Sequence, residues 1–376
     1  MKNLSYLFTI LTIVTFSCKE KSLKSIAINS NESEEFNYSI ETVVEGLEAP
    51  WGMVFLPDNS ILITEKKGEL IHFKNGKKNL VKGLPEIHVY GQGGLLDIEL
   101  DPDYDKNGWI YLSFSSDLEK DEKGGNTTIM RAKLSNDELV NSEILYKATP
   151  NTKKGAHFGS RIEFDTEGYL FFSVGDRGNR DENPQDISRD GGKIYRINAD
   201  GSIPKDNPFY NEKGAKKAIY SYGHRNPQGM AMHPETGEIW IHEHGPQGGD
   251  EINIIGAGKN YGWPKASYGI NYNGTSFTDH KTLAGMEDPI HYWVPSIAPS
   301  GMAFVTSDKY PQWKGNVLVG SLKFQYVNRC VLENNKVIKE EKLVEELGRV
   351  RCITEAPDGF IYVGIENKGI VRIVPD

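Results

Sequence analysis

Apolar positions along this chain occur in short runs, and none of the long segments after residue 37 has the 3.6-residue spacing of an amphipathic helix. The runs are rich in Val, Ile, Tyr and Phe, and Gly, Asp, Asn and Pro separate them. This composition is typical of β-strands joined by tight turns. The pattern therefore predicts an all-β chain.

One sequence unit recurs six times: an apolar strand, a turn rich in Pro, Asp and Gly, and a second apolar strand. In the first copy, residues 51–55 are followed by Pro57-Asp58-Asn59 and then by residues 61–63. The other copies begin near residues 95, 160, 229, 301 and 352. Six such units predict a six-bladed β-propeller with four-stranded antiparallel blades, in preference to a β-sandwich or two barrels.

The two ends of the repeat region can close the ring. A strand-like segment, Tyr38–Val44, precedes the first unit, and Gly369–Val374 is the last apolar run. Pairing these two segments would leave no open sheet edge. The propeller domain is therefore predicted to span residues 38–376, and the uneven spacing of the units predicts long loops that gather on one face and build the site.

The first residues differ from the rest. Lys2 gives a basic start, and the apolar stretch from Leu4 to Ser17 is shorter than the ~20 residues of a membrane-spanning helix, so residues 1–17 are predicted to be a signal peptide. Ser17-Cys18 resembles the end of a lipobox, which predicts lipidation of Cys18; ordinary signal-peptidase cleavage nearby is the alternative. Residues 18–37 are then a polar linker. We expect an exported periplasmic or outer-membrane lipoprotein of a Gram-negative-type bacterium, in contact with the membrane only through its lipid anchor.

Charge and cysteine content narrow the partners. The 376 residues include 43 Lys+Arg and 52 Asp+Glu, a net charge of −9, and no basic run is interleaved with aromatic residues, so no nucleic-acid partner is expected. Cys330 and Cys352 lie in strand-like runs; separate buried thiols are favoured over a disulfide, which the sequence alone cannot test.

Two short motifs look like metal sites but do not fit them. Asp101-x-Asp103-x-Asp105-x-Asn107-Gly108 resembles an EF-hand loop, but its Gly is displaced and position twelve is Leu112, so a turn between strands is predicted. His242 and His244 would share one face of a strand, but no third ligand follows at a recognisable spacing, so zinc is not expected.

Polar clusters in the loops carry the candidate chemistry. They include residues 90–94, 156–161, 173–178, 222–229, 243–253 and 260–264. Four cations stand at equivalent strand boundaries of three repeats: Arg225, Lys323, Arg349 and Arg351. Four cations on one funnel of an acidic protein suit a small polyanionic ligand.

These strings, above all residues 221–232 and 244–264, resemble the soluble quinoprotein sugar dehydrogenases, which use pyrroloquinoline quinone (PQQ), and most closely the bacterial aldose sugar dehydrogenases. The resemblance covers about residues 40–376. It implies PQQ- and calcium-dependent oxidation of aldose sugars at C1 to lactones.

The resemblance also implies residue roles. His157 would be the general base that takes the proton of the anomeric hydroxyl while hydride passes to the quinone, Asp176 would support His157, and Arg225 would stabilise negative charge on the reduced cofactor. The implied cofactor-binding residues are Gln92, Arg225, Asn226, Lys323, Arg349 and Arg351, with Tyr292, Trp293 and Ser296 from a looser match. The implied calcium ligands are the carbonyls of Gly245 and Pro246 and, at a further site, Glu251, the Tyr261 carbonyl and Asp250.

Two departures from the family pattern concern the sugar. Ala156 stands where glucose dehydrogenases of this family have an acid, and His244 replaces a glutamine. The electron acceptor is expected to be a cytochrome or a membrane quinone. Two other functions remain open: a non-catalytic propeller that binds a carbohydrate or a protein, as in the hedgehog-interacting proteins, and a calcium-dependent lactonase-type propeller.

Overall fold

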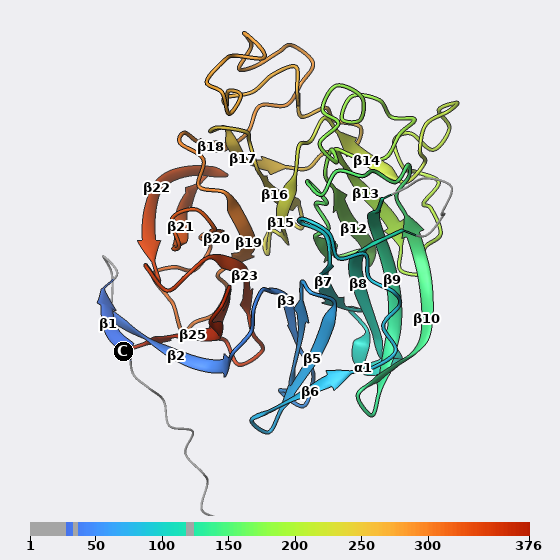
Figure 1. Ribbon diagram of the computed structural model, residues 1–376. Coiled ribbons are helices and arrows are strands. Elements are labelled where there is room, and N and C mark those ends of the chain that lie inside the picture. Colours follow the sequence, from blue (N-terminus) through green and yellow to red (C-terminus); the bar gives the residue numbers. More distant parts are fainter. Residues whose placement is uncertain (1–27, 33–36, 118–123) are drawn as a thin grey trace, which may run out of the picture.

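The computed structural model describes residues 28–32, 37–117 and 124–376, which form six β-sheets around a common axis (Figure 1). The described part contains one short helix, α1 (Tyr104–Asn107). The predicted six-bladed β-propeller is confirmed. The predicted signal peptide and Cys18 lie outside the described residues.

Each blade is an antiparallel meander whose first strand lies nearest the axis. The first three blades comprise β3 (Pro50–Phe55), β4 (Ile61–Glu65), β5 (Glu69–Lys74), β6 (Lys77–Val81); β7 (Leu95–Leu100), β8 (Trp109–Ser116), β9 (Asn126–Ser135), β10 (Glu138–Lys147); and β11 (Ile162–Phe164), β12 (Tyr169–Val174), β13 (Lys193–Asn198), β14 (Ile219–Tyr222). The next two comprise β15 (Pro227–Met232), β16 (Ile239–Glu243), β17 (Asp250–Ile254), β18 (His291–Trp293); and β19 (Pro299–Phe304), β20 (Val317–Ser321), β21 (Val327–Glu333), β22 (Lys336–Leu343).

The last blade closes the ring as predicted. It joins β23 (Val350–Glu355), β24 (Ile361–Ile365) and β25 (Gly369–Pro375) to β2 (Asn37–Glu45) from the other end of the chain. Tyr38 lies opposite Pro375 and Glu45 opposite Gly369. Within the segment predicted as a linker, β1 (Ile28–Glu32) pairs with the outer edge of β2, because that edge still offers backbone hydrogen-bonding groups.

The fold brings the candidate loops to one face. The inner strands β3, β7, β15, β19 and β23 each show a register irregularity near their first residues, where a bulge bends the strand and re-aims its backbone. The segments that precede or open these five strands line one cavity on the axis. Because the inner strands all enter their blades from that end, side chains far apart in sequence converge there.

Other local expectations are also met. Asp101 accepts hydrogen bonds from the Asp103 N–H and the Asn107 Nδ2, so the EF-hand-like segment is a turn. Cys330 on β21 and Cys352 on β23 are buried free thiols.

Apolar side chains of neighbouring blades pack together, as Trp240 does with Phe304. Within the described residues, no helix has the length and hydrophobicity needed to cross a bilayer.

Candidate active site

His157 and Asp176 form the central pair of the site. The His157 Nδ1 lies 2.6 Å from the Asp176 Oδ1, and the His157 side chain is 17% exposed whereas Asp176 is buried. Burial lowers the pKa of His157; the hydrogen bond to Asp176 opposes this shift, and the positive charge of Arg225 adds to it. His157 is therefore neutral near pH 7, with Nδ1–H donated to Asp176 and Nε2 left to accept a proton.

The backbone that presents His157 is strained and tightly held. His157 has a φ of 54°, and the neighbouring residues Ser160 and Arg177 have φ values of 79° and 57°, all in the left-handed region. The Gln92 Oε1 accepts the His157 N–H at 2.7 Å, and Arg177 donates to the carbonyls of Ala156 and Lys154. Such strain persists only where surrounding contacts enforce it, and it concentrates at functional sites.

Asp176 is fixed by donors on both carboxylate oxygens. Oδ1 also accepts the Gly178 N–H at 2.7 Å, and Oδ2 accepts the Trp263 Nε1–H at 2.8 Å. Burial alone would raise the pKa of Asp176, but the hydrogen bond and charge of His157, with Arg225 and Trp263, outweigh it and lower the pKa. Asp176 therefore stays ionised and orients the imidazole.

Close backbone packing joins this pair to the next blade. A Cβ on Gly175 would lie 2.4 Å from the His157 carbonyl oxygen and 2.8 Å from the Asn226 Oδ1, so only glycine allows the approach. The Asp176 N–H donates to the Arg225 carbonyl at 2.7 Å, and the Gly159 N–H donates to the Asn226 Oδ1 at 3.1 Å.

Arg225 and Asn226 keep unused donors at this site. Arg225 Nη1 donates to the His244 carbonyl at 3.0 Å, and its guanidinium lies 5.3 Å from the centroid of the Trp263 ring. The buried Arg225 Nε and Asn226 Nδ2 have no hydrogen-bond partner among the described residues. Buried unpartnered donors are costly unless a ligand accepts from them, so these atoms fit a ligand rich in oxygen.

A cavity of about 310 Å³ opens beside the pair. His157, Asp176, Arg225 and Trp263 line its inner part. Two loops form most of its outer wall, one with residues 178–182 and one with Asn271 and Tyr272. Lys154 and Pro246 complete the wall from two further loops. The Arg180 Nη1 donates to the Asn271 Oδ1 at 2.9 Å, which ties the two loops together.

The predicted cations of the last blade lie on a second cavity, of about 480 Å³, which Gln92, His244, Arg349 and Arg351 line. Arg349 and Arg351 both bind the Glu366 carboxylate. Burial alone would raise the pKa of Glu366. The charges and hydrogen bonds of Arg351 and Arg349 outweigh burial and lower this pKa. One carboxylate therefore offsets half of the positive charge of the two arginines.

Four predicted cofactor residues are placed elsewhere. Tyr292 stacks on Tyr268 at 3.8 Å between ring centroids, the Trp293 Nε1 donates to Glu340, and Ser296 donates to Asp250. β18, which carries the first two, is the outermost strand of its blade. The Lys323 ammonium lies over the Phe324 ring at 4.9 Å. Of the described residues that line the two cavities, none belongs to this group of four.

The predicted calcium ligands divide into two groups. Asp250 accepts from the N–H groups of Gly245, Ile297 and Ala298 and from Ser296, so its oxygens already have donors and it organises these loops.

Glu251 has a different environment. It lies opposite Glu243 on β16, and burial, followed by the charge of Glu243, raises the pKa of Glu251 well above its usual value. The buried Asn253 Oδ1 beside them lacks a donor within the described part of the chain. Tyr261 stacks on His224, which is bound to Glu243. This group of oxygens fits a hard cation.

His242 and His244 are held by backbone carbonyls. Their Nε2 atoms lie 3.0 Å from the Gly301 carbonyl oxygen and 2.6 Å from that of Pro299. Burial lowers the pKa of His242 to about 3. Across the described ranges, no three His, Cys, Asp or Glu side chains cluster as metal ligands.

Sequence reasoning missed three residues that shape the site. The Trp263 indole fixes Asp176, although the sequence offers Trp263 only as part of a matched string. Arg177 holds the segment before His157, and Glu366 binds both Arg349 and Arg351. The sequence did contain a signal for Trp263, because residues 244–264 are among the strings that most resemble the family. Nothing in the local sequence around Glu366 indicates its partners.

Comparison with known proteins agrees with this geometry. A family model described as glucose/sorbosone dehydrogenase matches residues 47–372. The chain is 43% identical over 333 residues to aldose sugar dehydrogenase YliI of Escherichia coli (strain K12), covering 86% of this chain and 89% of that protein.

Solved structures show the same relationship. The apo form of the soluble aldose sugar dehydrogenase from Escherichia coli matches with a TM-score of 0.85 and 39% identity, over 90% of this chain and 100% of that one. The PQQ-bound aldose sugar dehydrogenase from Streptomyces coelicolor matches with a TM-score of 0.73 and 28% identity, over 90% and 98%. The chain therefore belongs to the glucose/sorbosone dehydrogenase family and is an oxidoreductase that acts on CH–OH groups of sugars.

Proposed function

We propose that this protein oxidises the C1 hydroxyl of aldoses to give lactones, in a reaction that depends on PQQ and calcium. The observation that carries the proposal is the His157–Asp176 pair, which faces a cavity that Arg225 also lines. The buried Arg225 Nε and the buried Nδ2 of the adjacent Asn226 have no partner among the described residues. A sugar dehydrogenase needs a neutral base beside a site for an electron-accepting group, and these residues provide both.

His157 removes the proton of the anomeric hydroxyl. Its Nδ1–H is committed to Asp176, so Nε2 is the basic atom, and the lowered pKa keeps that atom unprotonated near pH 7. Proton removal leaves an imidazolium, which the ionised Asp176 stabilises. Trp263 and Gly178 keep Asp176 in place while the charge develops.

The unpartnered donors suit the cofactor's oxygens. Arg225 and Asn226 would hold it beside His157, and Gln92, Arg349 and Arg351 would hold its carboxylates from the second cavity. When bound there, PQQ would supply the acceptor for the hydride that leaves C1. The buried Arg225 guanidinium stabilises negative charge in its neighbourhood without reorganising. The PQQ-bound relative from Streptomyces coelicolor supports this assignment.

For calcium, the backbone of Gly245 and Pro246 would hold an ion against the cofactor, where it would act as a Lewis acid. Pro246 lines the His157 cavity, and Asp250 holds the Gly245 N–H at 2.8 Å. The further ion would be held by Glu251 and the Tyr261 carbonyl, with the unpartnered Asn253 Oδ1 as an additional ligand among the described groups. There the ion would offset the facing carboxylates of Glu243 and Glu251.

Dye reduction by the purified protein tests the proposal. The protein is supplied with Ca²⁺ alone, or with Ca²⁺ and PQQ, and assayed against a panel of aldoses. We expect activity only with PQQ, and strongly reduced activity in the His157→Gln variant. Turnover of lactones with Ca²⁺ alone would indicate a lactonase instead, and sugar binding without turnover would indicate a binding propeller.

Export and anchoring remain proposals that rest on the sequence. We propose that acyl chains on Cys18 tether the domain to a membrane, where a cytochrome or membrane quinone accepts the electrons. Replacing Cys18→Ser should move the protein from the membrane fraction to the soluble fraction.

A further inference from the structure

Arg161 lies on the propeller axis, immediately before β11, and its role is not explained by the chemistry proposed for His157. Its side chain is 6% exposed. Its Nε donates to the Gln228 carbonyl at 2.8 Å, its Nη1 to the Trp51 carbonyl at 3.2 Å, and its Nη2 to the Arg351 carbonyl at 2.8 Å. One guanidinium thus binds the backbones of three other blades.

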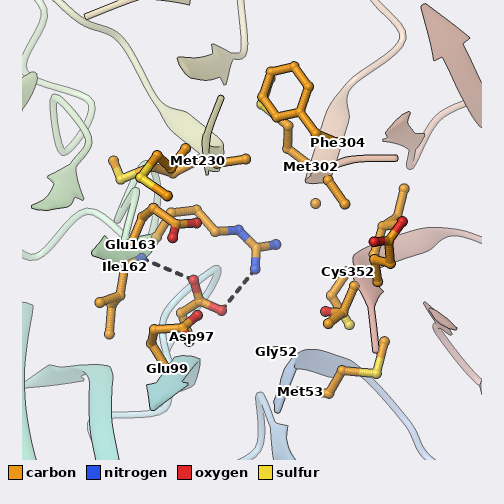
Figure 2. A pocket seen from close by; sticks show the side chains of 18 of the residues that line it. Gly52, Met53, Asp97, Glu99, Ile162, Glu163, Met230, Met302, Phe304 and Cys352 are labelled. Carbon is orange, nitrogen blue, oxygen red and sulfur yellow. Dashed lines mark hydrogen bonds and ion pairs between the residues drawn. The ribbon is translucent and has the colours of Figure 1, made fainter. Parts of the chain in front are cut away.

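Asp97 completes this arrangement from a further blade. The Arg161 Nη1 lies 3.0 Å from the Asp97 Oδ1, and the Ile162 N–H donates to the Asp97 Oδ2 at 3.0 Å; both contacts are drawn as dashed lines in Figure 2. A Cβ on Gly52 would lie 2.6 Å from the Asp97 Oδ1, so β3 must carry glycine there to admit the carboxylate. The one blade not yet involved joins through Ser300 on β19, whose Oγ donates to the Arg351 carbonyl at 2.9 Å.

The three carbonyls that accept hydrogen bonds from Arg161 lie at β-bulges of the inner strands. Register irregularities at Pro50/Gly52, Pro227/Gly229 and Val350/Cys352 enclose Trp51, Gln228 and Arg351. A bulge turns a carbonyl out of the ladder, and a buried carbonyl then needs another donor. Arg161 supplies these donors with the planar fork that lysine lacks.

The pair also separates two cavities. Trp51, Gln228 and Arg351 line the cavity of about 480 Å³ that contains the predicted cofactor residues. Asp97 and Arg161 line a third cavity, of about 280 Å³, that continues along the axis past Met230 (Figure 2). The Trp51 ring lies 3.9 Å from the Arg161 guanidinium and covers it.

We propose that Arg161 is a positioning residue of the cofactor site. It fixes the backbone of Arg351 and Gln228. Together with Asp97 it forms the floor of the cavity of about 480 Å³ that contains the predicted cofactor residues. It acts on the cofactor through these neighbours and not by contact. The cofactor part of the inference rests on the proposed function, whereas the structural part does not.

The first test uses the protein without cofactor. Hydrogen exchange of the amides of Arg351 and Gln228 is compared in the wild type, in Arg161→Lys and in Arg329→Lys. Arg329 is a matched control, because it is also buried and paired with an acid, but it lies on β21 and its partner Glu341 lies on β22 of the same blade. We expect roughly tenfold faster exchange in Arg161→Lys only. Unchanged exchange would overturn the inference.

The second test measures the dissociation constant of PQQ by quenching of tryptophan fluorescence in the presence of Ca²⁺. Arg161→Lys should bind roughly tenfold more weakly than the wild type, and Arg329→Lys should bind normally even if its melting temperature falls. In the double variant with Arg351→Gln, the two effects should not add, because Arg161 acts through Arg351. Additive effects, or an unchanged constant in Arg161→Lys, would contradict the positioning role.

The two tests distinguish a failure of the proposed function from a failure of the inference about Arg161. A wild type that does not bind PQQ contradicts the proposed function, while the exchange measurement still decides whether Arg161 holds the floor. If Arg161→Lys does not fold, Asp97→Asn removes the ion pair while keeping the shape of the side chain. It should also increase exchange at Arg351, and failure to do so would overturn the inference.

Discussion

The histidine side and the arginine side of the funnel differ in how their polar groups are satisfied. On the histidine side, His157 and Asp176 are paired, but Arg225 Nε and Asn226 Nδ2 have no partner in the described part of the protein. On the arginine side, Arg349 and Arg351 already share Glu366.

This difference separates chemistry from binding. The histidine side combines a neutral base with unused donors, which is costly for stability and useful for a ligand. On the arginine side, Glu366 offsets half of the positive charge of the two arginines, so an anionic ligand must share these arginines with Glu366. We therefore expect substitutions of His157 and Asp176 to change turnover and substitutions on the arginine side to change cofactor affinity.

The largest effect is expected for His157→Gln. Glutamine can still accept a hydrogen bond but is not a base, so kcat should fall by about 10²- to 10⁴-fold while PQQ binding is retained. His72→Gln is the matched control, because His72 is also paired with an aspartate, Asp137, on a different blade. Turnover near the wild-type value in His157→Gln would remove the base from the mechanism.

Asp176→Asn should lower kcat by about 10²-fold and move the pH profile. A general base works only above its pKa, and the pKa of His157 is lowered, so the acid limb of kcat/KM should lie below pH 6.5. Removing the carboxylate charge removes an interaction that opposes this lowering, and the limb should shift to still lower pH. Asp190→Asn, a buried carboxylate bound by Tyr146 and Tyr195, should leave the limb in place.

A smaller effect of the opposite sign is expected for Glu366→Gln. Without its negative charge, Arg349 and Arg351 are free to bind anionic groups, and PQQ affinity should rise by about fivefold while thermal stability falls. Glu355→Gln is the control, because Glu355 lies at the other end of β23. Its carboxylate accepts hydrogen bonds from the N–H groups of Thr306 and Ser307. Weaker PQQ binding in Glu366→Gln would mean that Glu366 positions the arginines.

The smallest effect is expected for Arg349→Gln. Its side chain is 46% exposed, whereas that of Arg351 is 11% exposed, so solvent screens the Arg349 charge more strongly. PQQ affinity should fall about two- to fivefold in Arg349→Gln and by more in Arg351→Gln, with kcat unchanged in both. The dissociation constant of each variant is measured by titration with PQQ. Equal losses of affinity in the two variants would show that solvent exposure does not set how much each arginine contributes to PQQ binding.

The sequence determined the fold and the ends of the ring. Six strand–turn–strand units and the segments at Tyr38 and Gly369 predicted the blades and their closure, because a strand period of two and its turn residues are local properties. The string around His157 and Asp176 also indicated the pair that the structure brings together.

Only the tertiary structure decided which groups are satisfied and which are left free. Arg161 and Arg351 are 190 residues apart and meet because the ring closes, and Glu366 reaches both arginines from β24's end. The outer position of β18 removes Trp293 from the cavities, and the donors on Asp250 come from two loops. Such partners are set by the packing of distant blades, whose contacts leave no periodic signal in the chain.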